Sequence, residues 1–149
     1  MTALWKELRP HELQDAYLRC ESRFVVVPAG RRSGKTECAK RRMIRKALSQ
    51  TQYDDAWYIC GAPTHGQAKR IFWRDLKEMV PRDVLLRPPS EGQLSLTLVN
   101  GAEITVVGLD APERIEGRSI NGAVLDEYGN MKESVWGEHL RPALSDRMG

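Results

Sequence analysis

The chain has 149 residues, 23 Lys and Arg against 20 Asp and Glu, a formal charge of +3 and 41% hydrophobic residues. This composition is typical of one globular domain and excludes disordered and collagen-like chains. No apolar run approaches the roughly 20 residues that cross a bilayer, and residues 2–7 contain no apolar signal core, so we expect an intracellular protein without membrane contact.

The first half of the chain predicts two strand-helix units. Pro10 begins a short helix over residues 11–18. The β-branched run 23–27 predicts a buried strand that ends at Pro28. Helical spacing of apolar residues then covers 34–50.

The second strand-helix unit is followed by a hairpin. Residues 56–60 form an apolar strand, and Thr64 is placed to cap a helix from 65 to about 80. Two apolar runs, 94–99 and 103–107, flank Asn100-Gly101, which is a strong hairpin signal.

The last part of the chain returns to an alternating pattern. Residues 110–121 form a polar loop, 123–125 an apolar strand, and a helix begins near Ser134. Strands that alternate with helices predict an α/β fold with a mostly parallel sheet and functional groups at the carboxyl ends of the strands.

The strongest motif is a phosphate-binding loop over residues 29–36. Its glycines let backbone N–H groups wrap phosphates, Lys35 reaches the β and γ phosphates, and the Thr36 hydroxyl ligates Mg²⁺. The first position is Ala29 instead of the usual glycine, and an ordinary strand-to-helix turn is the alternative interpretation. The candidate nucleotide-binding residues are Ala29, Gly30, Arg31, Arg32, Ser33, Gly34, Lys35 and Thr36.

An acidic pair, Asp126 and Glu127, follows the strand 123–125. In phosphate-loop ATPases the first carboxylate holds the metal and the second polarises the attacking water. Such acids also occur as helix caps and at strand ends on the surface. The loop upstream favours the catalytic interpretation.

Arginines are the third group of candidates, because a guanidinium can neutralise charge that develops on the γ phosphate. Arg31 and Arg32 lie inside the loop, whereas Arg114 and Arg118 lie in the polar segment before the acidic pair. Residues 31–46 as a whole contain eight basic residues and one acid. This basic run predicts either phosphate contacts or a solvated helix face.

Together these residues resemble the N-terminal ATPase domain of the large terminase subunit of tailed bacteriophages, a DNA-packaging motor. The resemblance extends over most of the chain, and its most specific part combines the arginine-rich loop, Glu-Gly-Arg and a tyrosine after the acidic pair. The matching motifs are residues 8–10, 25–36, 62–64, 67–68, the hairpin, 114–119, 125–129 and 140–144.

The resemblance implies a P-loop NTPase of the additional-strand, RecA-like class that hydrolyses ATP with Mg²⁺. It implies that Arg31 senses phosphate, that Asp126 coordinates the metal and that Glu127 is the catalytic glutamate. Arg114 or Arg118 corresponds to an arginine finger that acts on a neighbouring subunit. Gln14 is the candidate adenine contact, although Glu12 occupies the spacing first expected for it.

The resemblance also implies partners: double-stranded DNA, a portal protein, a small terminase subunit and further copies in a ring, in the cytoplasm of a bacterial host. It leads us to expect a partial ATPase domain over residues 1–149, incomplete at its C-terminus, because no Ser/Thr-Pro coupling segment and no nuclease domain follow. No nuclease activity is expected. A helicase-like DNA translocase and a nucleotide- or DNA-binding scaffold without turnover remain alternatives.

Overall fold

The computed structural model describes residues 9–149, so Leu8, part of the first motif, lies outside the described residues. Among the described residues, no helix combines the length and apolar character that crossing a bilayer requires. The helices are α2 (Glu12–Arg19), α3 (Lys35–Ser49), α4 (His65–Ala68), α5 (Arg74–Met79) and α6 (Arg141–Ser145), with π-helical segments at Lys69–Trp73 and Val135–Leu140. The strands are β1 (Trp57–Ala62), β2 (Ser95–Thr97), β3 (Glu103–Gly108) and β4 (Gly122–Leu125).

The four strands form one mixed sheet in the order β2-β3-β1-β4. The central strand β1 is parallel to both β3 and β4, and β2 is antiparallel to β3. The predicted hairpin and the mostly parallel sheet are therefore confirmed. Gly101 closes the hairpin with a φ of +84°, and a Cβ there would lie 2.0 Å from the carbonyl oxygen of Asp54, so the turn requires glycine.

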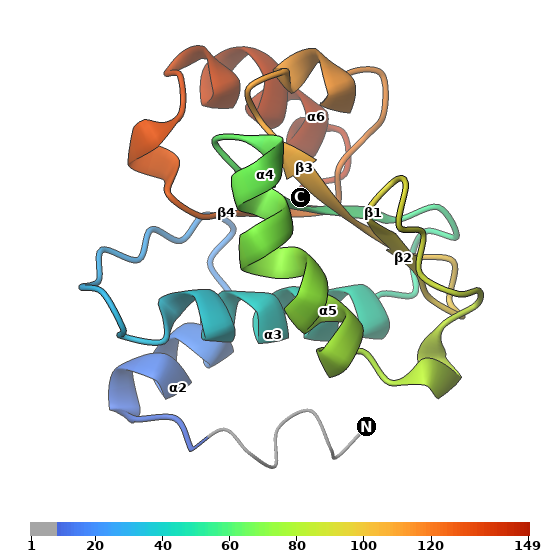
Figure 1. Ribbon diagram of the computed structural model, residues 1–149, viewed down its shortest axis with the longest axis horizontal. Helices are drawn as coiled ribbons and strands as arrows, with labels where there is room; N and C mark the ends of the chain where they lie inside the picture. The colour runs from blue at the N-terminus through green and yellow to red at the C-terminus, as the bar shows by residue number, and fades with distance from the viewer. Residues whose placement is uncertain (1–8) are drawn as a thin grey trace.

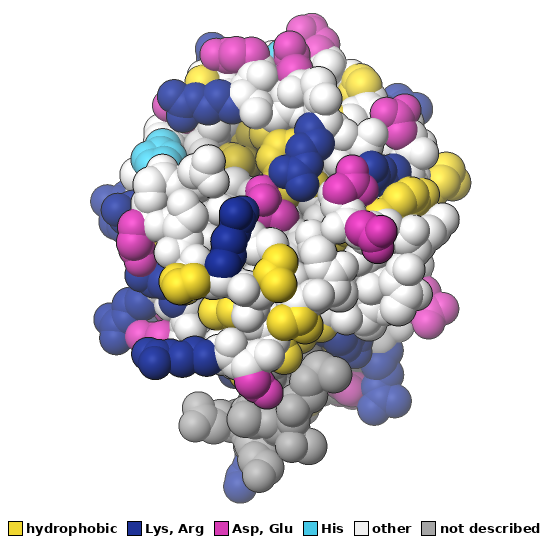
Figure 2. Space-filling view, turned by 90° about the vertical axis from the view of Figure 1, so that its right-hand side faces the viewer, with side chains coloured by type: hydrophobic (Ala, Val, Ile, Leu, Met, Phe, Trp, Pro, Cys, Tyr) yellow, Lys and Arg dark blue, Asp and Glu magenta, His cyan; other side chains and the backbone are white. Residues whose placement is uncertain are grey.

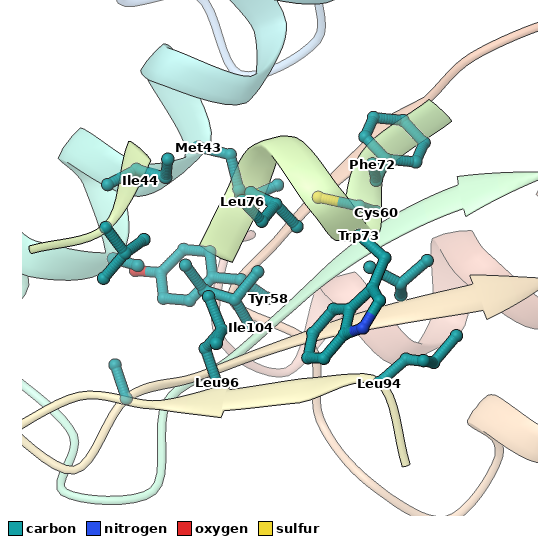
Figure 3. Packing of buried hydrophobic residues seen from close by; sticks show 14 of the residues in the cluster. Met43, Ile44, Tyr58, Cys60, Phe72, Trp73, Leu76, Leu94, Leu96 and Ile104 are labelled. Atoms are coloured by element: carbon teal, nitrogen blue, oxygen red, sulfur yellow. The ribbon is translucent and has the colours of Figure 1, made fainter. Parts of the chain in front are cut away.

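Helices cover both faces of the sheet (Figure 1). Alternate residues of β1 enter two separate apolar clusters, because successive side chains of a strand point to opposite faces. Tyr58 and Cys60 pack with α3 and with the α4–α5 helix, as Figure 3 shows. Trp57 and Ile59 pack with the helical segment at the C-terminal end of the described chain. Burial on both faces explains why β1 is apolar throughout.

The predicted helices are confirmed, and two of them begin at side-chain caps. His11 accepts a hydrogen bond from the backbone of Gln14, and Thr64 accepts one from Gln67. The helix expected over 65–80 runs through α4 and α5 with a π-helical turn between them. Leu13 of α2 is 76% exposed.

The strand predicted over residues 23–27 is wrong. This segment joins no strand of the sheet, and the side chains of Phe24, Val25, Val26 and Val27 are 37% to 88% exposed. Its contacts are with the C-terminal part of the chain: Arg23 donates to the Gly149 carbonyl (2.8 Å), and the Phe24 ring meets the Trp136 ring edge to face. A β-branched run favours extended backbone, but a strand forms only where a neighbour supplies ladder hydrogen bonds.

Candidate nucleotide-binding site

The phosphate-binding loop lies at the N-terminus of α3, at the left of Figure 1. Gly34 caps the helix in the left-handed region with a φ of +78°, and Arg32 has a φ of +62°. The N–H groups of the first turn of α3 have no partner within the helix, which makes this end suited to an anion. An open pocket of about 300 Å³ lies here, lined by Arg32, Ser33, Gly34, Lys35, Thr36, Glu37 and Lys40.

The fold brings the loop together with the acidic pair. The Thr36 hydroxyl donates a hydrogen bond to the Asp126 carboxylate (2.7 Å), although the two residues are 90 positions apart. Asp126 directly follows β4, and its backbone N–H donates to the Gly61 carbonyl of β1 (3.0 Å). The site therefore lies at the carboxyl ends of parallel strands, as the sequence predicts.

This pair of oxygen ligands fits Mg²⁺. Magnesium binds through one or two protein oxygens and completes its coordination with water and phosphate, and Thr36 and Asp126 supply a hydroxyl and a carboxylate. Across residues 9–149 no cluster of three or more His, Cys, Asp or Glu could hold a metal. The buried Ser33 hydroxyl also lacks a hydrogen-bond partner in the described structure, so a polar group inside the loop remains available to a ligand.

Glu127 lies beside Asp126 in a strained backbone conformation. Its φ is +55°, which is unfavourable for a residue with a Cβ, and its N–H donates to its neighbour's carboxylate (2.9 Å). The Glu127 carboxylate is exposed and accepts a hydrogen bond from Asn130 (3.4 Å). A strained, exposed carboxylate next to a candidate metal-binding carboxylate is suited to activating water.

Two of the three cationic residues of the loop, Arg32 and Lys35, line the pocket, and Arg31 is not among its lining residues. The Lys35 ammonium donates to the Ala29 carbonyl (3.4 Å), a weak contact that a phosphate can replace. Arg31 and Arg32 are exposed, as are Ala29 and Gly30. The loop thus presents three cations without a close carboxylate partner among the described residues.

Gln14 also reaches the loop. Its side-chain amide donates to the Ser33 carbonyl (2.9 Å), 19 positions along the chain. Gln14 therefore lies next to the loop, while its contact with adenine stays a prediction.

Much of the basic run on α3 is committed to contacts inside the protein. Lys40, Arg41 and Arg42 are each less than 10% exposed. Lys40 pairs with Asp75 on α5, Arg41 pairs with Glu37 (2.8 Å), and Arg42 donates to the Tyr17 carbonyl at the end of α2 (2.6 Å). Lys40 and Arg42 join α3 to α5 and to α2, and Arg41 is bound within α3, so these three side chains are not a solvated helix face.

Lys40 also lines the pocket and was not among the predicted site residues, although its position one turn after Thr36 places the two on the same helix face. Behind Lys40 lies Cys60 on β1. Burial raises the pKa of the Cys60 thiol to about 12, and the nearby Lys40 ammonium offsets part of that rise. Cys60 is therefore an inert thiol that packs beneath the site.

The fold does not bring Arg118 to the loop. Its guanidinium pairs with Glu103 (3.1 Å) and lies 4.6 Å from the centre of the Trp57 ring. Glu103 and Trp57 are the first residues of β3 and β1, so Arg118 lies about 16 Å along the strands from the carboxyl ends. Figure 2 shows this side of the molecule, where basic side chains lie among acidic ones.

Arg114 differs from Arg118. It lies in the 3-10 turn Pro112–Ile115, is exposed, and makes no ion pair or side-chain hydrogen bond within residues 9–149. The neighbouring Pro112 and Ile115 are buried and anchor the turn.

The chain is similar to known proteins over most of its length. Residues 27–143 match the family described as terminase large subunit, T4likevirus-type, N-terminal. The large terminase subunits of Thermus virus P23-45 and Thermus phage G20c are each 31% identical to the chain over 160 residues. These matches include 95% of the chain, which spans about a third of the length of each relative (32%).

Solved structures confirm the fold class. The ATPase domain of the Thermus phage P74-26 large terminase has a TM-score of 0.81 and 26% identity, over 95% of this chain and 62% of that one. The large terminase of another thermophilic bacteriophage, solved in complex with ADP, has a TM-score of 0.62 and 17% identity, over 97% of this chain and 33% of that one. At that identity the second structure supports the fold alone.

Proposed function

Because the chain belongs to the T4likevirus-type terminase large subunit family, within its N-terminal region, we propose that it binds and hydrolyses ATP with Mg²⁺. We further propose that this hydrolysis drives double-stranded DNA into a viral capsid. The observation that carries the enzymatic part is the hydrogen bond between Thr36 and Asp126. It joins the lysine-bearing loop to the acidic pair, and phosphoryl transfer from ATP requires both.

Each residue of the site has a role in this proposal. Lys35 and the backbone N–H groups of the loop bind the β and γ phosphates, and Arg31 senses the γ phosphate. Thr36 and Asp126 hold Mg²⁺, which when bound neutralises charge on the phosphate oxygens. Glu127 orients the attacking water and accepts its proton.

Arginine from a neighbouring copy completes the site in this proposal. A guanidinium supplied between subunits is worth roughly 10³ to 10⁵ in rate. We favour Arg114 over Arg118 for this role, because Arg118 is already held by Glu103 and Trp57, whereas Arg114 is exposed on an anchored turn.

The packaging role is supported by family membership and by the structural similarity to a phage ATPase domain. It implies duplex DNA, a portal protein, a small terminase subunit and other copies of this chain in a ring as partners, in the cytoplasm of a bacterial host. Residues 1–149 act as part of the ATPase domain in this proposal.

A matched pair of variants at Thr36 tests the enzymatic proposal. Thr36→Val keeps the shape of the side chain but removes the hydroxyl, whereas Thr36→Ser keeps the hydroxyl. Phosphate release from ATP is measured with and without Mg²⁺ and with duplex DNA. We expect Thr36→Val to lose most Mg²⁺-dependent hydrolysis and Thr36→Ser to retain it.

Two results would contradict the proposal. Unchanged Mg²⁺-dependent turnover in Thr36→Val would show that the Thr36 hydroxyl takes no part in hydrolysis. An absence of ATP binding by the natural chain would favour the alternative of a scaffold without turnover. Strand separation on forked DNA would instead indicate a helicase. Turnover near 1 s⁻¹ by a demonstrated monomer, roughly the rate of complete phosphotransferases, would exclude the need for an arginine from another subunit.

A further inference from the structure

Both ends of the Gln14 side-chain amide are bound within the protein. Its oxygen accepts a hydrogen bond from the His11 N–H (3.2 Å), and its nitrogen donates to the Ser33 carbonyl (2.9 Å). The contact with the loop is close, because a Cβ on Gly34 would lie 2.6 Å from the same nitrogen. One of the two N–H donors of this amide therefore binds the phosphate-binding loop.

This hydrogen bond fixes the direction of a backbone N–H in the loop. The Ser33 carbonyl and the Gly34 N–H belong to one trans peptide unit, whose C=O and N–H point in opposite directions. Since Gln14 holds the carbonyl toward α2, the Gly34 N–H faces away from α2. Backbone N–H groups of such loops are the groups that bind phosphate.

The loop needs support at this point. Arg32 and Gly34, on either side of Ser33, both have left-handed backbone conformations, and such a conformation costs free energy for arginine. The Ser33 hydroxyl, although buried, forms no hydrogen bond in the described part of the chain. The side-chain hydrogen bond that supports this peptide therefore comes from Gln14.

The helix that carries Gln14 is itself fixed to α3. Arg42 donates to the Tyr17 carbonyl (2.6 Å) and lies 5.0 Å from the centre of the Tyr17 ring, and Arg45 donates to the Leu18 carbonyl. Cations at the C-terminus of a helix also interact favourably with its dipole. Gln14 is therefore held in a defined position relative to the helix that begins at the loop.

We propose that Gln14 is a positioning residue that orients the Ser33–Gly34 peptide for phosphate binding, and that it acts on the phosphates of the ligand instead of its base. This inference rests on the proposed binding of ATP. It differs from an adenine-reading role because it predicts the same effect on every ligand that carries a polyphosphate.

The test compares three ligands that differ in their base. Affinities for ATP, GTP and inorganic tripolyphosphate are measured by calorimetry for the natural chain and for Gln14→Met, which keeps the length but removes both polar groups. We expect all three affinities to fall by the same factor, about two- to tenfold, the worth of one hydrogen bond. The ratio of ATP to GTP affinity stays unchanged.

Leu13→Ala provides the control, because Leu13 is on the same helix and is 76% exposed. We expect it to leave all three affinities unchanged. Thermal unfolding shows whether each variant is folded at the temperature of the measurement. If Gln14→Met does not fold, Gln14→Asn keeps the amide but shortens its reach by one methylene, and the same uniform loss is expected.

A loss confined to ATP, with GTP and tripolyphosphate unaffected, would overturn the inference and assign Gln14 to the base. Unchanged affinities for all three ligands would overturn it as well. If the natural chain binds none of the three, the proposed function itself fails, and this positioning role fails with it.

Discussion

The ion pair between Lys40 and Asp75 predicts an asymmetric response to mutation. It joins α3, which begins at the phosphate-binding loop, to α5. The Lys40 side chain is 6% exposed, whereas that of Asp75 is 39% exposed. Removing the Asp75 side chain leaves the buried Lys40 ammonium without its ion-pair partner. Removing the Lys40 side chain leaves the Asp75 carboxylate, which water can reach.

The expected losses in unfolding free energy follow from these exposures. Breaking a buried pair costs about 3–5 kcal/mol when the remaining charge is buried, so we expect Asp75→Ala to cost about 3 kcal/mol, at the low end because water enters beside Asp75. Lys40→Met replaces a buried cation with an apolar chain of similar length and should cost about 1 kcal/mol or less.

Urea and thermal denaturation of both variants and of the double variant Lys40→Met/Asp75→Ala measure these losses. We expect Asp75→Ala to lower the Tm by about 6–12 °C, at 2–4 °C per kcal/mol. The double variant should be more stable than Asp75→Ala alone, because it no longer contains a buried ammonium without an ion-pair partner. Equal losses in the single variants, or a double variant that loses the sum of both, would refute the reasoning.

The remaining predictions concern the catalytic groups. Lys35→Ala should weaken ATP binding by about 10- to 100-fold in calorimetry, the worth of a charge-assisted contact, and full turnover with a native circular dichroism spectrum would contradict this role. Glu127→Gln should bind Mg²⁺-ATP but hydrolyse it poorly, whereas Asp126→Asn should weaken Mg²⁺-dependent binding. Identical defects of the two variants in titrations would show that Asp126 and Glu127 do not have separate roles in metal binding and water activation. Arg118→Ala should lower the Tm because it removes a cation–π contact and an ion pair, worth about 1 kcal/mol together, while Arg114→Ala should leave the Tm unchanged and reduce only the ATPase rate of assembled protein.

The sequence predicted the local geometry of the site well, because each part of it is encoded by neighbouring residues. The loop glycine, the lysine and the start of α3 are contiguous, and Asp126 follows its strand directly. The contact between Thr36 and Asp126 spans 90 positions, yet it was predictable, since parallel strands place their carboxyl ends at one edge of a sheet.

Features that depend on distant partners could not be predicted in the same way. Residues 23–27 have the composition of a strand, but strand formation depends on a neighbour that no local pattern specifies. The position of Arg118 at the far end of the sheet depends on how the segment before β4 returns to the start of that strand. Gln14 was identified by its proximity in sequence to a proline motif, whereas its contact with Ser33 arises from the packing of α2 against α3.

The contacts of the basic run on α3 also depend on residues distant in sequence, and this affects how many of its cations can bind DNA phosphates. Eight cations in 16 residues suggest a strong electrostatic attraction to phosphates, but the contacts that a helical residue makes depend on which elements pack around the helix. Here α2 and α5 both lie beside α3, so Arg42 binds a backbone carbonyl of α2 and Lys40 pairs with Asp75 of α5. Burying such cations is tolerable only because each has a partner. A count of basic residues therefore overstates the number of phosphates that α3 can neutralise, and the cations left for a polyphosphate are mainly those of the loop at its N-terminus.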